Sequence, residues 1–528
     1  MLFWRESSVK TPVSTTVLIL VVAVLSLPVY AYTAAPSFTW AHDGADGGDL
    51  ITASVTGGVP HPSGYPTYLL LTSPLRHLPL GELAFRFNLF SGLCAAITIA
   101  LTGFSVQLAL EPVIQLSPAW RASIAAATAA AFAFSSTLWS QAVITEVYTL
   151  NVAFAAAVVY LLLRWRRSVR NDQTGRGRRW LALLGFVFGL GLGNHLSLLL
   201  LAPGIIYWLW THRREGSVRG LDLGASLLGL LLGLTIYGLL PLRASNDAIV
   251  NWADPRTPQR LWWLVSGRLY RRYLFTLPHS YLFPRFSAWA RELLNQFGVW
   301  GVALGLLGWW YLDGEDQPLT FFALTGFVLY SLYAIGYDTS DSYVYLLPAW
   351  LLFALWLGRG LAAGVETILS ARRLSRAAGT VLSVGLLLVV PMLSLGLHFG
   401  AADLHHDHEA TDYRIEALAA AGPNALIITN QDRSTFALWY HRYALGLRPD
   451  VTVVNAGLYA YGWYRRTLIS HHPNLGVVGP DGRHRSLGGL VKANLATSRP
   501  VYLADEMESL MSLYRTEPAG PLQRLFQP

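Results

Sequence analysis

The stretch VSTTVLILVVAVLSLPVYAYT, residues 13–33, is a nearly unbroken apolar run. A membrane-crossing helix needs about 20 mostly apolar residues, and this run is also longer than the core of a signal peptide. Similar windows follow at 88–109, 119–137, 143–163, 180–194, 195–211, 221–241, 292–312, 318–336, 344–365 and 377–398. Charged residues make up 13% of the 528 residues, about half the proportion in soluble proteins. The sequence predicts an α-helical polytopic membrane protein with about eleven spans, the first one retained as an anchor.

Basic segments between these windows predict the orientation. Arg5 and Lys10 precede the first window. The densest later clusters are RWRRSVRNDQTGRGRR (164–179), THRREGSVRG (211–220) and ARRLSR (371–376). The positive-inside rule places these clusters and the N-terminus in the cytoplasm. The net charge of +8 then reflects topology, so we expect no nucleic-acid partner. The Arg-rich, Lys-poor composition favours a bacterial plasma membrane.

The chain divides into a membrane part, 1–398, and a tail, 399–528. Two loops of the membrane part, 36–87 and 242–290, are too polar or too rich in proline to cross, and we expect both outside the cytoplasm. The tail contains the β-branched runs NALIITN (424–430), DVTVVNA (450–456) and PVYLADE (500–506). Such runs, bounded by Pro, Asn and Asp, predict a small extracytoplasmic α/β domain. Cys94 is the single cysteine, so no disulfide is expected.

The first outer loop carries the acidic stretch HDGADGGDL, residues 42–50, which holds Asp43, Asp46 and Asp49 among glycines. A calcium-binding EF-hand loop needs ligands at alternate positions and a glutamate at its twelfth, which the spacing here does not provide. A solvated glycine-rich turn explains the stretch equally well. His61 follows shortly in HPSGYP, as either a structural or a functional histidine.

Further polar residues are expected at the same surface of the membrane. Glu146 lies at the outer end of a span in TEVYTLN (145–151), where a carboxylate either faces a functional cavity or caps the helix at the interface. The others are Tyr148, Asn151, Asn194, His195, Arg243, Asp338 and Asp341. Their convergence predicts a polar site outside the cytoplasm. The sequence has no P-loop, G-x-S-x-G or zinc-binding Cys/His spacing, which argues against ATP-driven transport.

Longer motifs carry a family resemblance over most of the chain. They are DGGDLITASVTGGVPHPSGYPTYLLL (46–71), RFNLFSG (86–92), TEVYTLN (145–151), NHLSLLLLAPG (194–204), LPLRASNDAIVNWADPRT (240–257) and NQDRSTFALWYHRYALGLRPDVTVVN (430–455). In this order they resemble the protein O-mannosyltransferase-like family of GT-C membrane glycosyltransferases. The chain departs from the family in having Asp49 for a usual Glu and Ser63 for a second Pro.

The resemblance implies an integral-membrane enzyme that moves a sugar, with mannose as one candidate, from a polyprenyl-phosphate donor to a protein or lipid hydroxyl outside the cytoplasm. It implies that Asp46 and Asp49 are catalytic, because a carboxylate can take the proton of the acceptor hydroxyl. The loop glycines would let the backbone approach sugar and phosphate. The expected phosphate-binding residues are His61, Arg243 and His195, with Arg268, Arg271 and Arg272 as weaker candidates. The expected supporting residues are Glu146, Tyr148, Asn194, Asp341 and Trp252.

Two other functions are open on the sequence alone. A transporter or flippase of a lipid-linked saccharide also needs many spans, but it is expected to carry polar residues at mid-membrane depth in broken helices. A catalytically degenerate scaffold is favoured by the Asp at position 49. No cofactor is firmly predicted, and the residues leave the need for a divalent cation, the sugar, the acceptor and the stereochemical course open.

Overall fold

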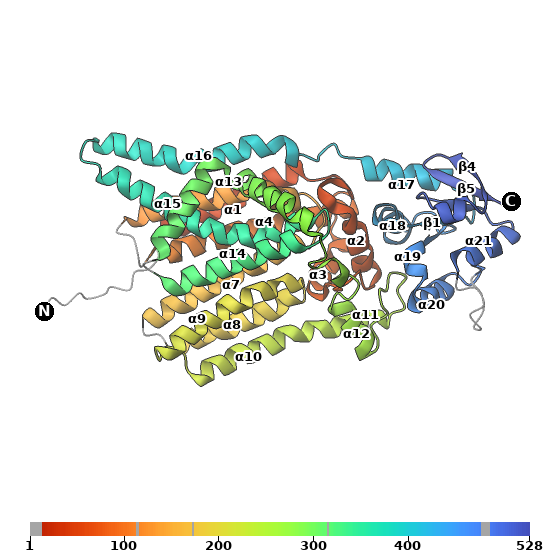
Figure 1. Cartoon of the computed structure of the whole chain (residues 1–528), viewed down its shortest axis with the longest axis horizontal. Coiled ribbons are helices and arrows are strands. Elements are labelled where there is room, and N and C mark those ends of the chain that lie inside the picture. The colour runs from red at the N-terminus through yellow and green to blue at the C-terminus, as the bar shows by residue number, and fades with distance from the viewer. Residues whose placement is uncertain (1–12, 112–115, 172–173, 314–315, 477–485, 528) are drawn as a thin grey trace.

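The computed structural model describes residues 13–111, 116–171, 174–313, 316–476 and 486–527. A long bundle of helices carries a smaller unit of helices and strands at one end (Figure 1). Arg5 and Lys10, on which the predicted orientation partly depends, lie outside the described residues.

The helices of the bundle coincide with the predicted apolar windows. They are α1 (Val13–Thr33), α4 (Leu83–Leu110), α5 (Pro118–Ala133), α6 (Ser136–Ala142), α7 (Tyr148–Arg170), α8 (Thr174–Leu192), η3 (Leu196–Leu201), α9 (Ala202–Arg214), α10 (Gly220–Leu234), η4 (Thr235–Gly238), α13 (Leu282–Asp313), α14 (Gln317–Gly336), η7 (Ser342–Leu346), α15 (Leu347–Ser370) and α16 (Arg376–Ala402). Helix α1 has the bounds of the first predicted window. The sequence therefore located the helical segments of the membrane part.

The structure contains fewer uninterrupted candidate spans than the sequence predicted. Among the described residues, seven helices are long and apolar enough to cross a membrane, and the α5 and α6 pair, bent by 65°, makes an eighth if it is one span. Eleven spans are not confirmed, because several windows hold broken helices. The window at 195–211 is split into η3 and α9, and α13 is interrupted at Gly298, which has a φ of 65°.

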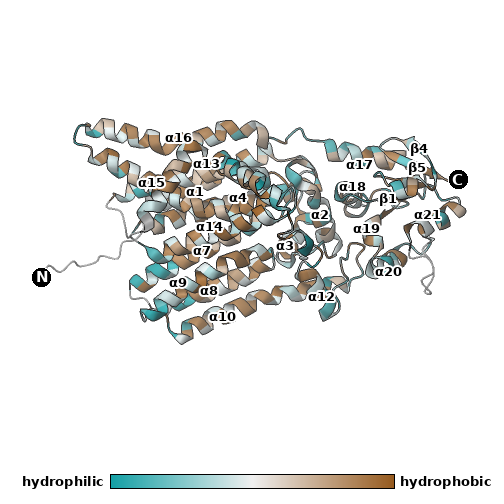
Figure 2. Cartoon of the chain, viewed as in Figure 1, coloured by the Kyte–Doolittle hydropathy of each residue, from teal (hydrophilic) through white to brown (hydrophobic). Residues whose placement is uncertain are grey.

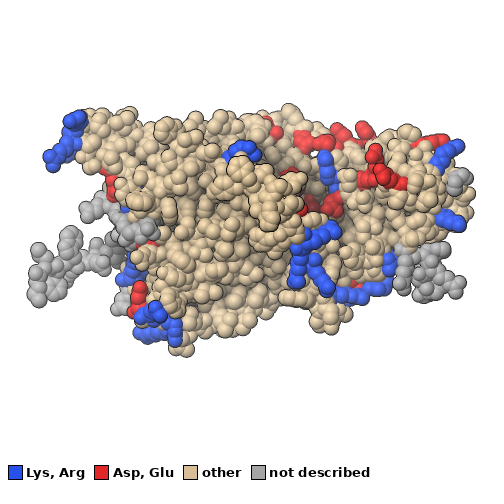
Figure 3. Space-filling view, viewed as in Figure 1, with Lys and Arg blue, Asp and Glu red and all other residues tan. Residues whose placement is uncertain are grey.

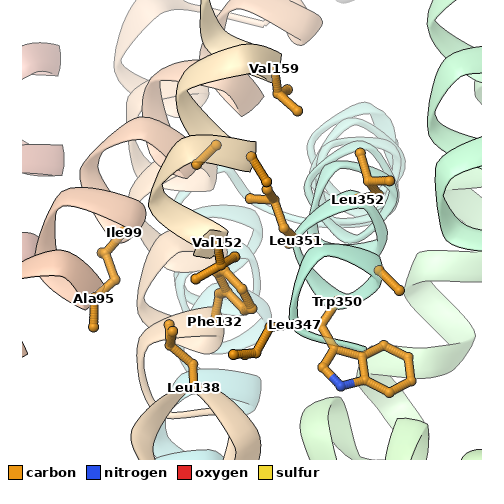
Figure 4. Close-up of a cluster of buried hydrophobic side chains, with 14 of the residues drawn as sticks. Ala95, Ile99, Phe132, Leu138, Val152, Val159, Leu347, Trp350, Leu351 and Leu352 are labelled. Carbon is orange, nitrogen blue, oxygen red and sulfur yellow. The ribbon is translucent and has the colours of Figure 1, made fainter. Parts of the chain in front are cut away.

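Helix α15 forms the centre of the bundle and is buried along most of its length. Figure 4 shows its Leu347 and Leu351 on the side of Phe132 of α5 and Val152 of α7. The outer helices differ, because α10 and α16 expose large apolar side chains. Brown, hydrophobic helices make up most of the bundle (Figure 2), and the visible face of its middle is almost free of charged side chains (Figure 3). An apolar belt around an apolar core marks a multi-pass membrane protein.

Two outer segments fold into short helices at the end of the bundle, as their prolines predict. The first contains η1 (Ala41–Asp46), α2 (Gly47–Thr56), α3 (Pro66–Thr72) and η2 (Ser73–His77). The second contains α11 (Leu239–Ala244), α12 (Pro258–Val265), η5 (Arg271–Tyr273) and η6 (His279–Tyr281). A short parallel bridge joins them, in which Val59 donates to Val250 and Trp252 donates to Val59, at 2.9 and 3.1 Å. This bridge brings the acidic stretch, His61 and Trp252 together.

The C-terminal segment contains a five-stranded sheet with the order β2-β1-β3-β5-β4. The strands are β1 (Leu426–Thr429), β2 (Thr452–Asn455), β3 (Val501–Leu503), β4 (Arg515–Ala519) and β5 (Leu522–Phe526). The first three are parallel and lie within the predicted β-branched runs, whereas the antiparallel β4–β5 pair was not predicted. The helices of this segment are α17 (Glu409–Ala420), α18 (Asp432–Trp439), η8 (Tyr440–Ala444), α19 (Ala456–Tyr459), α20 (Gly462–His471), α21 (Leu487–Ala496) and α22 (Glu508–Met511).

Helix α18 follows β1 directly and lies between the sheet and α2 of the outer segment (Figure 1). Its contact with α2 depends on glycine, because a Cβ on Gly48 would lie 2.4 Å from the carbonyl oxygen of Phe436. A Cβ on Gly47 would lie 2.9 Å from the carbonyl oxygen of Thr145. These two glycines of the acidic stretch therefore allow close packing between protein segments.

Candidate active site

A cavity of about 870 Å³ lies where the outer segments, the bundle and α18 meet. Side chains from distant parts of the sequence line it. Its charged and histidine side chains are Asp43, Asp46, His61, His195, Arg271, Asp338, Asp341, Asp432 and Arg433. Its tyrosines are Tyr65, Tyr148, Tyr270, Tyr273, Tyr333, Tyr337 and Tyr345. Aromatic rings beside polar groups are typical of a small-molecule binding site.

His61 and Asp49 form a buried pair beside this cavity. The Asp49 carboxylate accepts hydrogen bonds from the Nδ1 and the backbone N–H of His61, at 2.8 and 2.9 Å, and from the indole of Trp252, at 3.1 Å. The Asp49 side chain is 0% exposed and does not line the cavity. Through the two bonds from His61, Asp49 fixes the orientation of the imidazole ring, and it does so without lining the cavity.

Asp46 lies on the cavity side of His61. Its carboxylate is 3.4 Å from His61 Nε2, and its side chain is 35% exposed, toward the cavity that it lines. Burial raises the pKa of Asp46 to about 7, against the opposing effect of the His61 charge. Burial lowers the pKa of His61, but Asp46 and Asp49 outweigh it and raise that pKa to about 9. The site therefore holds a cationic imidazole between two carboxylates, only one of which faces the cavity.

Tyr65 completes the hydrogen bonding of His61. Its hydroxyl lies 3.0 Å from His61 Nε2 and donates to the Pro62 carbonyl at 3.1 Å. A hydroxyl that donates to a carbonyl can still accept from a protonated Nε2. Burial raises the pKa of Tyr65 well above its usual value, so this hydroxyl keeps its proton.

The cavity is also lined by His195, Tyr148 and Asp341. The sequence analysis expected these three residues at one polar surface of the membrane part. His195 Nδ1 accepts from the Ser197 backbone N–H at 3.2 Å, which leaves the ring proton on Nε2. Burial lowers the pKa of His195 to about 4, so this ring is neutral at pH 7, and burial also raises the pKa of Asp341. His195 is thus a neutral donor in a site where His61 is charged.

Besides Asp49, four predicted site residues do not line the cavity: Asn194, Glu146, Trp252 and Arg243. Asn194 is buried and donates to the Val147 carbonyl at 3.1 Å. Glu146 is also buried, and burial followed by the charge of Asp46 raises its pKa well above the usual range. Trp252 lies behind the site through its bond to Asp49.

Arg243 was predicted to bind the phosphate, but the structure gives its guanidinium other partners. Its guanidinium donates to the carbonyl oxygens of Gly58, Ala53 and Ser54 at 2.8, 2.7 and 3.0 Å, and to the Ser73 hydroxyl at 3.0 Å. These partners use its donors where α2 ends. Arg243 therefore fixes the first outer segment, and Arg271, a weaker candidate in the sequence, is the arginine of the second outer segment that lines the cavity.

Sequence reasoning missed the contribution of α18. Asp432 and Arg433 line the cavity, and the Phe436 ring stacks on His61 with centroids 6.4 Å apart and an interplanar angle of 18°. The sequence did indicate this region, because Asp432 follows the carboxyl end of a predicted strand. Ligand-binding residues of α/β units gather at the carboxyl ends of such strands. No group of three or more His, Cys, Asp or Glu side chains that could hold a metal ion is found in the described part of the chain.

The fold is similar to those of two membrane proteins of known structure. Its arrangement is similar to that of ArnT from Cupriavidus metallidurans bound to undecaprenyl phosphate, with a TM-score of 0.62 and 11% identity over 97% of this chain and 98% of that one. It is also similar to the oligosaccharyltransferase of Archaeoglobus fulgidus, with a TM-score of 0.54 and 11% identity over 94% of this chain and 70% of that one.

Sequence comparisons show which family the chain resembles. Residues 46–242 match the Protein O-mannosyl-transferase TMEM260 N-terminal domain, and residues 410–472 match the TMEM260-associated domain 2. Protein O-mannosyl-transferase TMEM260 of Mus musculus is 26% identical over 94% of this chain and 69% of its own length. The Dictyostelium discoideum protein of that name is 22% identical over 93% of this chain and 64% of its own length. The resemblance to the protein O-mannosyltransferase-like family is confirmed, and the chain spans about two thirds of these relatives.

Proposed function

We propose that this membrane glycosyltransferase moves a sugar, with mannose as the first candidate, from a polyprenyl-phosphate donor to a hydroxyl of a protein or lipid acceptor. The observation that carries the proposal is the Asp46 carboxylate, which faces a cavity at the end of an apolar bundle and is paired with a charged His61. The names of the relatives support the sugar, and the ArnT complex with undecaprenyl phosphate supports the lipid donor.

The proposed reaction uses Asp46 as the base. The acceptor oxygen forms a bond to the anomeric carbon while the bond between that carbon and the phosphate oxygen breaks. The acceptor proton goes to Asp46, and the electron pair of the broken bond leaves with the polyprenyl phosphate. The His61 charge opposes the effect of burial and so favours the ionised form of Asp46, and Asp49 acts as the residue that positions His61.

The leaving phosphate needs cationic or donor groups, and the cavity supplies them. We assign this role to Arg271 and to the neutral Nε2–H of His195, because both residues line the same cavity as Asp46. An arginine can bind a phosphate through two parallel hydrogen bonds from its guanidinium group. The tyrosines of the cavity wall offer flat faces and hydroxyls to the sugar.

The proposed orientation places this cavity outside the cytoplasm. Helices α7 and α9 lead away from the cavity and end in Arg167 and Arg170, and in Arg213 and Arg214. Basic side chains gather at the end of the bundle opposite the C-terminal unit (Figure 3). The positive-inside rule then puts that end in the cytoplasm and the C-terminal unit outside.

The rate of transfer is expected to depend on pH through the Asp46 and His61 pair. Asp46 must be ionised to act as a base, so kcat/KM should rise as pH rises through about 7, its raised pKa. His61 must stay protonated, so kcat/KM should fall as pH rises through about 9. A pH profile of the purified enzyme checks both limbs, and the rising limb should shift when His61 is replaced by Asn. A profile without a rising limb would contradict the role of Asp46.

The function itself is tested with purified protein in lipid nanodiscs and a panel of labelled polyprenyl-phosphate sugars. We expect the wild type to release or transfer sugar from at least one donor, with polyprenyl-phosphate mannose tried first. Release from no donor, together with movement of the sugar-lipid between leaflets of proteoliposomes, would replace the proposal by the transporter function. Inactivity in both assays would leave a non-catalytic scaffold.

A further inference from the structure

The loop before α18 is held rigidly in place by Asp505. Its Oδ2 accepts hydrogen bonds from the backbone N–H groups of Asn430 and Gln431, at 2.5 and 2.9 Å, and from the hydroxyl of Ser434, at 2.7 Å. A carboxylate that accepts several donors fixes the local backbone. The residue between these donors, Asp432, is therefore presented in a defined position.

Contacts of Arg433 fasten this segment to the acidic loop of the membrane part. The guanidinium lies over the ring of Trp40, 4.4 Å from its centroid, and donates to Glu409 at 3.1 Å. The Trp40 indole in turn donates to the Arg433 carbonyl at 3.2 Å. Because Trp40 and Arg433 both line the cavity, this contact is part of its wall. The charge of Arg433 is already shared with Glu409, which leaves Asp432 as the group of α18 that is open to a ligand.

The Asp432 carboxylate faces the cavity without a partner of its own. Among the described residues, no hydrogen bond or ion pair engages it, although it interacts electrostatically with His61 and Asp49. Burial raises its pKa, and the His61 charge opposes that effect. This carboxylate is exposed to the cavity that it lines, so it is free to accept a hydrogen bond from a ligand.

The position of Asp432 indicates which ligand supplies that donor. A lipid-linked donor reaches the cavity from the bundle side and carries an anionic phosphate, which a carboxylate repels. Asp432 belongs instead to the unit beyond the end of the bundle (Figure 1). A polypeptide that enters the cavity beside that unit would pass Asp432, and its backbone and side chains offer N–H and O–H donors.

We propose that Asp432 is an acceptor-binding residue, whose carboxylate accepts a hydrogen bond from an N–H or O–H of a polypeptide and holds the acceptor hydroxyl beside Asp46. The inference rests on the proposed function and deepens it, because it assigns the acceptor to the polypeptide class. It also gives α18 a part in recognition, whereas the membrane part supplies the base and the phosphate-binding groups.

The experiment compares two reactions of one enzyme in nanodiscs, with polyprenyl-phosphate mannose as donor. The first is transfer to a synthetic Ser/Thr peptide, and the second is release of mannose to water. We expect D432N to raise the KM for the peptide about tenfold or more, the loss expected for a hydrogen bond to a charged group, and to affect release to water much less. D432E should recover part of the peptide affinity. The matched control is E416Q, which removes an exposed carboxylate from α17 and should behave as wild type.

The outcomes separate this inference from the proposed function. An unchanged peptide KM in D432N, with an active wild type, would overturn the acceptor role of Asp432 alone. Equal loss of transfer and release in D432N would also overturn it, since Asp432 would then act on the donor or the whole site. A preference of the wild type for lipid acceptors over the peptide would do the same. A wild type inactive in both reactions would overturn the proposed function and this inference together.

Discussion

Replacing Asp46 by Asn is expected to lower kcat for sugar transfer by about 10²–10⁴-fold, the range typical for the loss of a general base. The Asn side chain has nearly the same shape, so the cavity is retained while the proton acceptor is lost. The side chain already faces the cavity, and its removal leaves the His61 contact to Asp49 intact. We therefore expect D46N to fold with a melting temperature close to that of the wild type.

Single-turnover transfer from polyprenyl-phosphate mannose measures this effect separately from product release. Donor binding should survive in D46N, because the proposed phosphate-binding group, Arg271, is unchanged. Retention of more than about a tenth of the wild-type rate would exclude Asp46 as the base. Activity in D46N that vanishes on replacing Asp432 would identify that second carboxylate as the base instead.

Replacing Asp49 by Asn is expected to destabilise the protein by about 3–5 kcal/mol, the cost of breaking a buried ion pair by removing one partner. Asp49 is 0% exposed and His61 only 5%, so water cannot replace the lost carboxylate. His61 would also lose the acceptor that fixes its orientation, and transfer should fall along with stability. Asp49 thus differs from Asp46, whose replacement should affect the rate alone.

Thermal unfolding in nanodiscs, followed by the fluorescence of the buried tryptophans, measures the stability of D49N beside wild type, D46N and E416Q. The family's usual residue gives a further comparison, because D49E keeps the charge on a longer side chain. An unfolding temperature of D49N equal to that of E416Q would show that the buried pair contributes nothing. Loss of activity in D49N at unchanged stability would point to a direct role in the chemistry.

Hydrophobic patterning was enough to predict the helical segments and three strands, which the structure shows to be parallel. Lengths of apolar runs report directly on helix positions, as α1 shows. They do not report on breaks, such as the one between η3 and α9, because a broken helix and a continuous one have the same composition. The β4–β5 hairpin was not predicted, because its sequence has a proline in β4 and lacks a clear alternating pattern.

The sequence singled out Asp46, His61 and His195, which line the cavity, because they lie in or near the acidic loop or at the end of an apolar window. Sequence position could not distinguish two aspartates three residues apart, because the side of His61 on which each lies depends on tertiary packing. The role of Arg243 was equally hidden, since the carbonyl oxygens that occupy it belong to α2 and the residues that follow. Asp432 was missed because it lies in the segment most distant in sequence from the acidic loop.

The contact between Trp40 and Arg433 also bears on how the protein matures. Trp40 precedes the bundle helices α4 to α16 in the chain, whereas Arg433 and Phe436 follow all the bundle helices. Until α18 docks, the His61 ring lacks its stacking partner and the cavity lacks part of its wall. A chain whose synthesis has not reached α18 therefore has an incomplete cavity.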